Sequence, residues 1–213
     1  NILAGCDRFR HANEFEDERT QIMLKADYFV GDHVISFGVE HEDFSLFNVF
    51  LPAARGRFQF NGYADLVAGI TDLDYINATS NNARDGGASW GYDKLTFFVQ
   101  DTWQVSDTLE LGFGFRYEEF DQSDAPAFSQ SVFDTYGVDT SKNLDGLDLI
   151  MPRVSFRWDV ADRTTLSGGF GLFAGGDPKV WTSNAFSTGT FFSTGIFTRD
   201  EYEVAPFQIP QVL

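Results

Sequence analysis

The side chains in this sequence that could hold a metal ion are acidic residues around one histidine. His41 stands between Glu40 and Glu42, and Asp43 follows directly. Imidazole and carboxylate groups bind zinc when they converge on one point. In an extended chain, however, neighbouring side chains alternate between the two faces of a strand, so these residues do not converge. A solvated acidic rim is the favoured interpretation, and we expect no metal site in the chain.

Two polar stretches carry oxygen ligands of the kind that calcium prefers. Residues 121–124 read Asp-Gln-Ser-Asp, and residues 81–85 read Asn-Asn-Ala-Arg-Asp. Carboxylate and amide oxygens on flexible loops can coordinate Ca²⁺, but neither stretch has the ligand spacing of the EF-hand. The favoured interpretation of both stretches is therefore ordinary loop.

A further set of charged residues could contact a passing solute or another domain. The set lies at alternating positions in two apolar segments and consists of Glu110, Arg116, Glu118, Arg153 and Arg157. The alternative, which is slightly favoured, is that these residues form ion pairs across neighbouring strands. They remain our candidates for substrate binding.

Catalytic chemistry finds no support in the sequence. We see no nucleophile beside a base, no phosphate-binding loop and no helix with metal-ligand spacing. We therefore expect that the protein is not an enzyme, has no catalytic residues and needs no cofactor.

The composition excludes several classes of protein. Of the 213 residues, 32 are acidic and 15 are basic, which gives a formal net charge of -17. A nucleic-acid partner is therefore not expected, because phosphate binding needs a basic surface. The single cysteine, Cys6, excludes an intramolecular disulfide framework. No apolar run approaches the 18 residues of a transmembrane helix.

The clearest structural pattern lies in residues 94–120. Apolar residues alternate with charged residues and glycine: Leu109, Leu111, Phe113, Phe115 and Tyr117 fall on one face of the segment. Alternation with a period of two predicts a β-strand, because successive side chains point to opposite faces. Residues 95–103 form its predicted antiparallel partner, so 94–120 is a hairpin.

Two further hairpins are predicted at about 21–44 and 151–174, where apolar residues alternate in the same way. The long connections between the hairpins are predicted as irregular. One short helix is expected in residues 61–70, with Asn61 as its N-cap. Residues 1–20 are interpreted as loop with room for one strand, and strand content is possible around 190–197.

The three predicted reversals share a pattern in which an aromatic residue is followed by valine and aspartate. Tight turns are expected at 30–32, 105–107 and 160–163. Because tight turns alternate with long connections, all three turns should lie at one end of a single antiparallel sheet. Short turns at one end and long loops at the other are typical of outer-membrane barrels.

The aromatic residues before the turns are Phe29, Trp103 and Trp158, and we expect them to form one level girdle. Asp101 interrupts the apolar face two residues before Trp103. A charge so near the interface costs about 0–1 kcal/mol in a barrel, against about 2–4 kcal/mol for a basic residue at the midplane. Asp101 is therefore compatible with a membrane-facing strand.

The fold class is accordingly all-β, an antiparallel meander of long hairpins. Its apolar face could meet lipid in a barrel, or a second sheet in a soluble sandwich. The predicted strands approach the roughly 9–11 residues that cross a bilayer, which favours the barrel.

Several segments resemble a known family. Residues 98–103 (Phe-Val-Gln-Asp-Thr-Trp) and 109–118 (Leu-Glu-Leu-Gly-Phe-Gly-Phe-Arg-Tyr-Glu) resemble the barrel signature of TonB-dependent outer-membrane receptors. Residues 151–156 (Met-Pro-Arg-Val-Ser-Phe) are similar to a proline–arginine strand of those barrels. Residues 171–184, together with 56–60 and the predicted helix after them, resemble the Oar-like branch, whose plugs follow a carboxypeptidase-regulatory-like domain.

The resemblance implies that residues 1–213 form part of a large transmembrane outer-membrane β-barrel with long extracellular loops. Such receptors have roughly 22 strands around a plugged lumen, of which six are recognisable here. The plug domain, the TonB box and a terminal aromatic strand are absent from the sequence, so we expect a fragment of a longer protein.

The implied function is uptake of a scarce nutrient across the bacterial outer membrane. The implied partners are outer-membrane lipid, and a plug domain and the TonB complex that act through other parts of the protein. In that case Glu110, Arg116, Glu118, Arg153 and Arg157 face the lumen. The alternatives are a surface adhesion or interaction protein on the same barrel, and a soluble extracellular β-sandwich that binds a ligand. The substrate is unknown.

Overall fold

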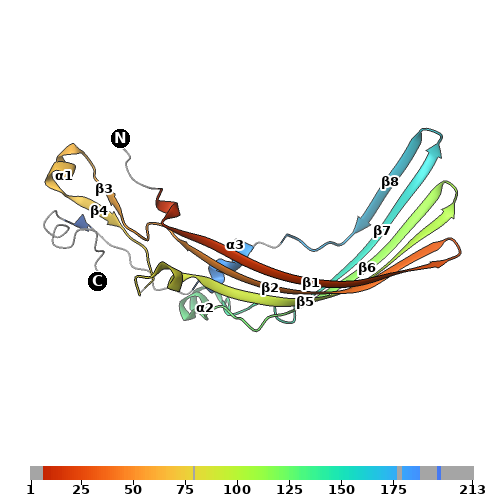
Figure 1. Cartoon of the computed structure of the whole chain (residues 1–213), viewed down its shortest axis with the longest axis horizontal. Coiled ribbons are helices and arrows are strands. Elements are labelled where there is room, and N and C mark those ends of the chain that lie inside the picture. Colours follow the sequence, from red (N-terminus) through yellow and green to blue (C-terminus); the bar gives the residue numbers. More distant parts are fainter. Residues whose placement is uncertain (1–6, 79, 177–178, 188–195, 198–213) are drawn as a thin grey trace.

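The chain folds around one six-stranded antiparallel sheet. The computed structural model describes residues 7–78, 80–176, 179–187 and 196–197. The strand order is β1-β2-β5-β6-β7-β8 (Figure 1). The strands are β1 Ala12–Val30, β2 His33–Leu51, β5 Ala88–Ser106, β6 Leu109–Asp121, β7 Asp148–Ala161 and β8 Thr164–Gly171. The sheet is all antiparallel, as the alternation in the sequence predicts.

The three tight turns lie at one end of this sheet, here called the turn end, as predicted (Figure 1). The first turn joins β1 and β2 through two residues, Gly31 and Asp32. Gly31 has a φ of 55°. A positive φ at the first central residue is a feature of the two-residue hairpin turns that match strand twist, and glycine adopts it without steric cost.

The predicted aromatic girdle is wrong at one of its three positions. Trp103 pairs with His33, which pairs with Val30, so Trp103 shares a face with Val30 and not with Phe29. The reason is the alternation along β1, whose apolar face is made of the even-numbered residues Ile22, Leu24, Ala26 and Tyr28, so that Phe29 points to the other side. Phe29 therefore lies on the face opposite Trp103 and Trp158.

One face of the sheet carries an apolar belt next to the turn end. The belt consists of alternate residues of 22–30, 35–39, 95–103, 109–117, 150–158 and 166–170. One register row across it runs Leu24, Val39, Phe97, Tyr117 and Ile150. Nine strand residues span about 26 Å, or about 20 Å across a bilayer at the usual tilt, which approaches the apolar band of about 25 Å in barrels.

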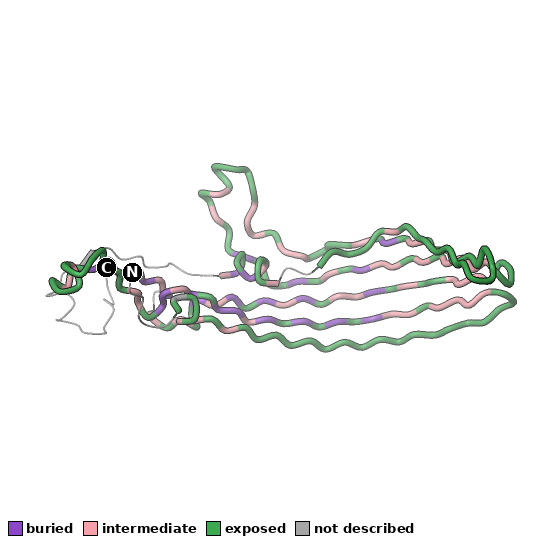
Figure 2. The backbone as a smooth tube through the Cα atoms, turned by 90° about the horizontal axis from the view of Figure 1, so that it is seen from above, coloured by how far each residue is buried: buried purple, intermediate pink, exposed green. Residues whose placement is uncertain are grey.

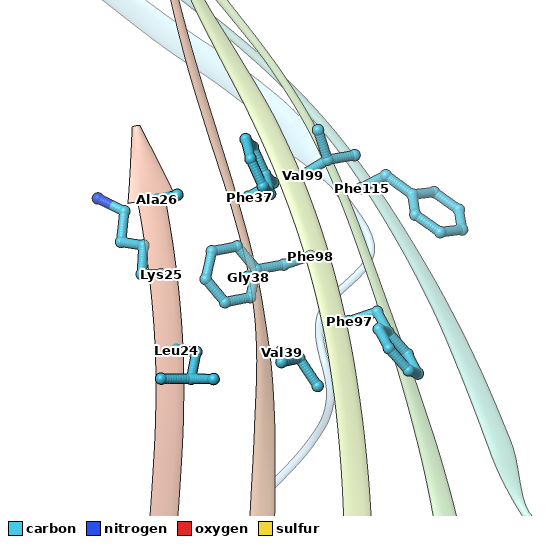
Figure 3. Close-up of a pocket in the computed structure, with 10 residues that line it drawn as sticks. All are labelled: Leu24, Lys25, Ala26, Phe37, Gly38, Val39, Phe97, Phe98, Val99 and Phe115. Carbon is cyan, nitrogen blue, oxygen red and sulfur yellow. The ribbon is translucent and has the colours of Figure 1, made fainter. Parts of the chain in front are cut away.

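The belt is uncovered in the described part of the chain. Leu24, Phe113 and Phe170 are 70%, 45% and 77% exposed. A shallow hollow of about 530 Å³ lies within the belt, between side chains of β1, β2, β5 and β6 (Figure 3). On the other side of the sheet the ring of Phe98 lies against Gly38, where a Cβ would collide with it. Large apolar surface of this extent marks a membrane or protein contact.

The strands continue well beyond the belt. Residues 12–20 belong to β1, in the stretch where one strand was allowed, and the strand in 45–51 and 88–93 contradicts the prediction of irregular structure there. β1, β2 and β5 each have 19 residues. Buried residues are concentrated in the far halves of β2 and β5, while the strand ends next to the turns are exposed or half-buried (Figure 2). In the far half of β5, Ala88, Trp90 and Tyr92 alternate with polar or small residues. The far half of β2 does not alternate simply, because other segments cover both of its faces.

Helix α3 Lys179–Phe186 packs on the face opposite the belt, here called the α3 face. Its Phe186 ring stacks on Trp90 with the ring centroids 5.6 Å apart, and Trp90 Nε1 donates a hydrogen bond to Ser183 Oγ at 3.0 Å. Phe44, Leu46, Ala88 and Tyr92 complete this buried cluster. The helix was not predicted from the sequence, where it follows a run of glycines.

On the belt face, the far end of β2 is covered by residues 76–78 and 80–86. Val49 and Leu51 pack there with Ala54, and Ile76 and Ala83 lie against them. The covering segment includes the short 3-10 helix η2 Ala83–Gly86. Arg84 pairs with Glu14 and its guanidinium lies 4.8 Å from the centre of the Phe47 ring.

A small second sheet lies beyond the far end (Figure 1). It consists of β3 Arg57–Gln59, β4 Thr71–Asp74 and β9 Ile196–Phe197. Between β3 and β4 stands the predicted short helix, α1 Tyr63–Ala68. Its N-cap is Gly62 and not Asn61, and no side chain caps it. β9 is the only part of the expected 190–197 strand that lies within the described residues.

Two further short helices were not predicted, η1 Arg8–Arg10 and α2 Gln130–Tyr136. α2 lies in the long connection between β6 and β7. Among the described residues, none of the helices has the length and hydropathy to cross a bilayer. The six-stranded sheet does not close on itself there, and β1 and β8 each pair on one side only.

Candidate functional site

The five charged residues singled out in the sequence all lie on the α3 face of β6 and β7. Glu110 stands directly opposite Arg157, and Arg153 stands opposite Gly114. Arg116 and Glu118 follow on β6 at alternate positions. The register thus brings the five onto one surface, but they form three separate environments along the strands.

The first environment is a cluster of carboxylates buried within the sheet. Arg116 Nε lies 2.7 Å from Glu118 Oε1, and its Nη2 lies 3.8 Å from Glu40 Oε1. Gln21 Nε2 donates to Glu40 Oε1 at 2.7 Å. The two carboxylates come from β6 and β2, and the Arg116 guanidinium between them reaches across the intervening strand β5, where its Nη2 also lies 3.5 Å from Thr96 Oγ1.

Glu42 is the next carboxylate along the same face. Its oxygens lie 3.7 Å from Arg19 Nε and 3.5 Å from Lys94 Nζ, and the Tyr92 hydroxyl donates to Oε1 at 3.0 Å. The Glu42 side chain is only 4% exposed. This carboxylate connects β1, β2 and β5 immediately before the aromatic cluster under α3.

Together these residues form an ionic ladder, defined here as Glu40, Glu42 and Glu118 with Arg19, Lys94 and Arg116. Burying a charge is costly unless it is paired and hydrogen-bonded, and each of the three carboxylates has such partners. The ladder has equal numbers of acidic and basic groups, so it presents polar but locally balanced surface. The ion pairs of the ladder link neighbouring strands and keep this face of the sheet polar. The six residues of the ladder include no nucleophile.

Sequence reasoning missed Glu40 and Glu42 as members of this site, because they were considered only as neighbours of His41. A signal was available. Extending the alternation of Ser36 and Gly38 places Glu40 and Glu42 on the same face as those small residues, opposite the apolar Ile35, Phe37 and Val39.

The second environment surrounds Arg157 and Glu110 near the turn end. The Arg157 guanidinium lies 4.0 Å from Asp159 Oδ1, which stands on the same strand, and it is 62% exposed. Glu110, although directly opposite in register, is not the ion-pair partner. A pair at this distance and exposure contributes about 0–1 kcal/mol.

The third environment is a hollow of about 510 Å³ around Arg153, floored by glycines. The guanidinium carbon lies 4.8 Å from the centre of the Phe173 ring. The Arg153 Nε is buried, and within the described chain it donates no hydrogen bond.

The residues considered as metal ligands do not come together. His41 lies on the belt face, where its Nε2 is 2.9 Å from Asp93 Oδ1, whereas Glu40 and Glu42 lie on the α3 face. In the described residues, three or more His, Cys, Asp or Glu side chains nowhere group closely enough to hold a metal ion.

The polar groups of the two stretches considered for calcium form hydrogen bonds within the protein. Asp124 Oδ2 accepts from the Gly91 backbone at 2.9 Å, and Gln122 bonds to the backbone of both Gly91 and Leu144. Asp85 accepts from Ser80 and Asn82 next to η2. In the connection between β6 and β7, hydrogen bonds from the hydroxyl and backbone N–H of Ser141 lower the pKa of Asp139.

Asp101 has a partner that the sequence did not indicate. Its Oδ2 lies 2.8 Å from His33 Nδ1, and the His33 ring stacks on Trp103 with centroids 5.2 Å apart. Both groups lie on the belt face near the turn end. The one carboxylate within the belt is therefore held by a neighbouring imidazole.

Comparison with known proteins gives one match. A family model described as an outer membrane beta barrel domain matches residues 5–210, which is nearly the whole chain. No curated protein and no solved structure shows significant similarity to the chain.

Proposed function

The chain belongs to the outer membrane beta barrel domain family and is therefore a protein of the bacterial outer membrane, and we propose that it forms part of the barrel of a TonB-dependent receptor that takes up a scarce nutrient. The segments that resemble TonB-dependent receptors of the Oar-like branch support this finer assignment. They lie in β5, β6, β7 and the region after β8.

The observation that carries the proposal is the contrast between the two faces of the sheet. The belt face is apolar over about nine residues of β1, β5, β6 and β7. The α3 face behind it carries glycines, Arg153 and Arg157, and the ionic ladder lies at the far edge of the belt and beyond it. Small barrels fill their interior with side chains, whereas wide barrels enclose a polar, wet or plugged lumen. A face this charged and this rich in glycine fits the wide kind.

In this arrangement the belt meets lipid and the α3 face borders the lumen. The turn end lies at the periplasmic side, and the far halves of β1, β2 and β5 extend outside the cell with the small sheet. The open edges of β1 and β8 would pair with further strands of the same barrel. The proposed partners are outer-membrane lipid, a plug domain and the TonB complex; nucleic acid is not among them, and no catalytic activity is proposed.

Surface adhesion is the second candidate function. It is favoured by the extension of the strands beyond the belt, which holds α1 and the small sheet away from the membrane surface (Figure 1). Such an extension suits contact with another surface as well as capture of a solute.

Deletion of the complete gene separates the two functions. We expect the deletion strain to lose fitness in competition when one nutrient is scarce, and to lose none in a strain that already lacks TonB, because uptake needs that energy source. A defect in surface attachment that is independent of TonB, with no nutrient phenotype, would refute uptake and favour adhesion.

A further inference from the structure

We propose that the hollow around Arg153 is a subsite for a small oxyanion, that is, a carboxylate or phosphate group of a solute at the α3 face. The inference rests on the proposed uptake function and names the chemical class of group that the site takes. Four features carry it: the shape of the hollow, the missing ion partner of Arg153, the aromatic ring against it, and the polar groups around it.

The hollow exists because glycine alternates with larger residues on two strands. Gly112 and Gly114 on β6, and Gly169 and Gly171 on β8, lie on the α3 face on either side of Arg153 and Ser155 on β7. A Cβ at Gly171 would stand 3.0 Å from Arg153 Cγ, and one at Gly112 would collide with Ser155 Oγ. Side chains at these positions would therefore fill the space of about 510 Å³. That volume is within the usual range of about 300–1,000 Å³ for small-molecule sites.

Arg153 differs from the other basic residues on the α3 face of the sheet. Those residues each have a carboxylate within 4.0 Å on a neighbouring or the same strand: Arg19, Lys25, Lys94, Arg116 and Arg157. Arg153 has no such partner in the described part of the chain, and its buried Nε has no acceptor there. In a chain of net charge -17, acidic partners are abundant, so an arginine without one is notable.

The surroundings of Arg153 fix its orientation. The Phe173 ring lies against the guanidinium at 4.8 Å from its carbon, which holds the group through a cation–π contact. Arginine presents planar paired donors that match carboxylate and phosphate oxygens, and its charge does not depend on pH. The Gln100 amide and the Ser155 hydroxyl line the same hollow and supply further donors.

The alternative occupant is an acidic side chain from another domain inside the barrel. The observations favour a small solute, because the hollow has the volume of a ligand site and its floor is bare backbone at four glycines. Glycine permits close approach of a ligand to the backbone, which a side chain reaching in from a neighbouring domain does not require.

The test is calorimetric titration of the complete gene product in detergent with sodium benzoate and with sodium phosphate, against sodium chloride at the same ionic strength. Benzoate combines a carboxylate with a ring that can contact Phe173. We expect binding of at least one of the two anions, and a loss of at least tenfold in affinity for Arg153→Gln. Lys25→Gln is the control, since Lys25 is a basic residue of the same face with a carboxylate partner, Asp27, on its own strand; the affinity of this variant should stay within twofold of the parent.

Two further variants keep the test decisive if Arg153→Gln fails to fold. Arg153→Lys retains the charge without the paired donors and should weaken binding several-fold, while Phe173→Ala, at an exposed position beyond β8, should weaken benzoate more than phosphate. Absence of anion binding by the parent, or equal binding by the parent and the Arg153 variants, would overturn the inference. The nutrient competition above measures uptake separately, so either proposal can fail without the other.

Discussion

An arginine scan along β6 tests how the belt sits in the membrane. Leu109, Phe113 and Tyr117 lie on the belt face at the turn-end edge, the centre and the far edge of the apolar run. Successive positions are four residues apart, or about 13 Å along the strand and about 10 Å in depth at the usual tilt. The three substitutions Leu109→Arg, Phe113→Arg and Tyr117→Arg therefore sample two interfaces and the midplane.

The expected cost follows from this depth. A basic residue at the midplane costs about 2–4 kcal/mol and one near an interface about 0–1 kcal/mol. Phe113→Arg should thus lower the ratio of folded to unfolded protein by about 30- to 700-fold, while the two edge substitutions lower it by about fivefold at most. The measurement is equilibrium unfolding of the complete gene product in lipid vesicles. Equal costs at the three positions, or a cost that is smallest at Phe113, would refute the placement of the belt in lipid.

Three further predictions concern contacts outside the centre of the belt. His33→Ala should cost about 1–3 kcal/mol in unfolding free energy because it leaves the Asp101 carboxylate unpaired, and adding Asp101→Asn should recover much of that loss; no recovery would contradict the pairing. Trp90→Phe should cost about 0.5–1.5 kcal/mol through the lost hydrogen bond to Ser183, and Ser183→Ala should add little to it; additive costs would argue against that bond. The 213-residue chain without detergent should be insoluble or associate through its open edges, and a monodisperse, cooperatively unfolding monomer in plain buffer would argue against an open sheet.

The turn-end half of the sheet could be predicted from the sequence because most of its apolar residues lie on one face, which gives a clear alternation along each strand. Alternation in residues 109–117 identifies a strand, its two faces and its partner. The far half of β2 could not be predicted in the same way. In β2, Phe44 and Leu46 are buried under α3 while Val49 and Leu51 are buried under residues 76–78 and 80–86, so apolar residues lie on both faces and the period of two disappears.

Helix α3 shows a second limit of sequence reasoning. Its residues Lys179–Phe186 follow a glycine-rich run, and the helix is short. Contacts distant in sequence stabilise it, including the hydrogen bond between Trp90 and Ser183 and the position of Lys179 over the Phe44 ring at 3.8 Å. Tertiary packing of this kind outweighs local propensity in short helices.

The sequence predicted which face of the sheet carries the candidate residues, but it did not predict their ion-pair partners. Parity places Arg116, Arg153 and Arg157 on one side of the sheet, and the register confirms that they share it. The pairing of Arg157 with Asp159, and of Arg116 with Glu40 two strands away, depends on stagger and side-chain reach that alternation does not encode. That Arg153 has no carboxylate partner among the described residues becomes visible only once those pairs are known.

The central claim is that the belt face contacts lipid and the α3 face contacts water. Nitroxide labels placed singly at residues 109–118, in the complete gene product with Cys6 replaced, report this directly in outer membranes. We expect accessibility to oxygen to peak at Leu109, Leu111, Phe113, Phe115 and Tyr117, and accessibility to a water-soluble nickel complex to peak at the residues between them. Alternation in the opposite phase, or water access at both sets of positions, would contradict the account.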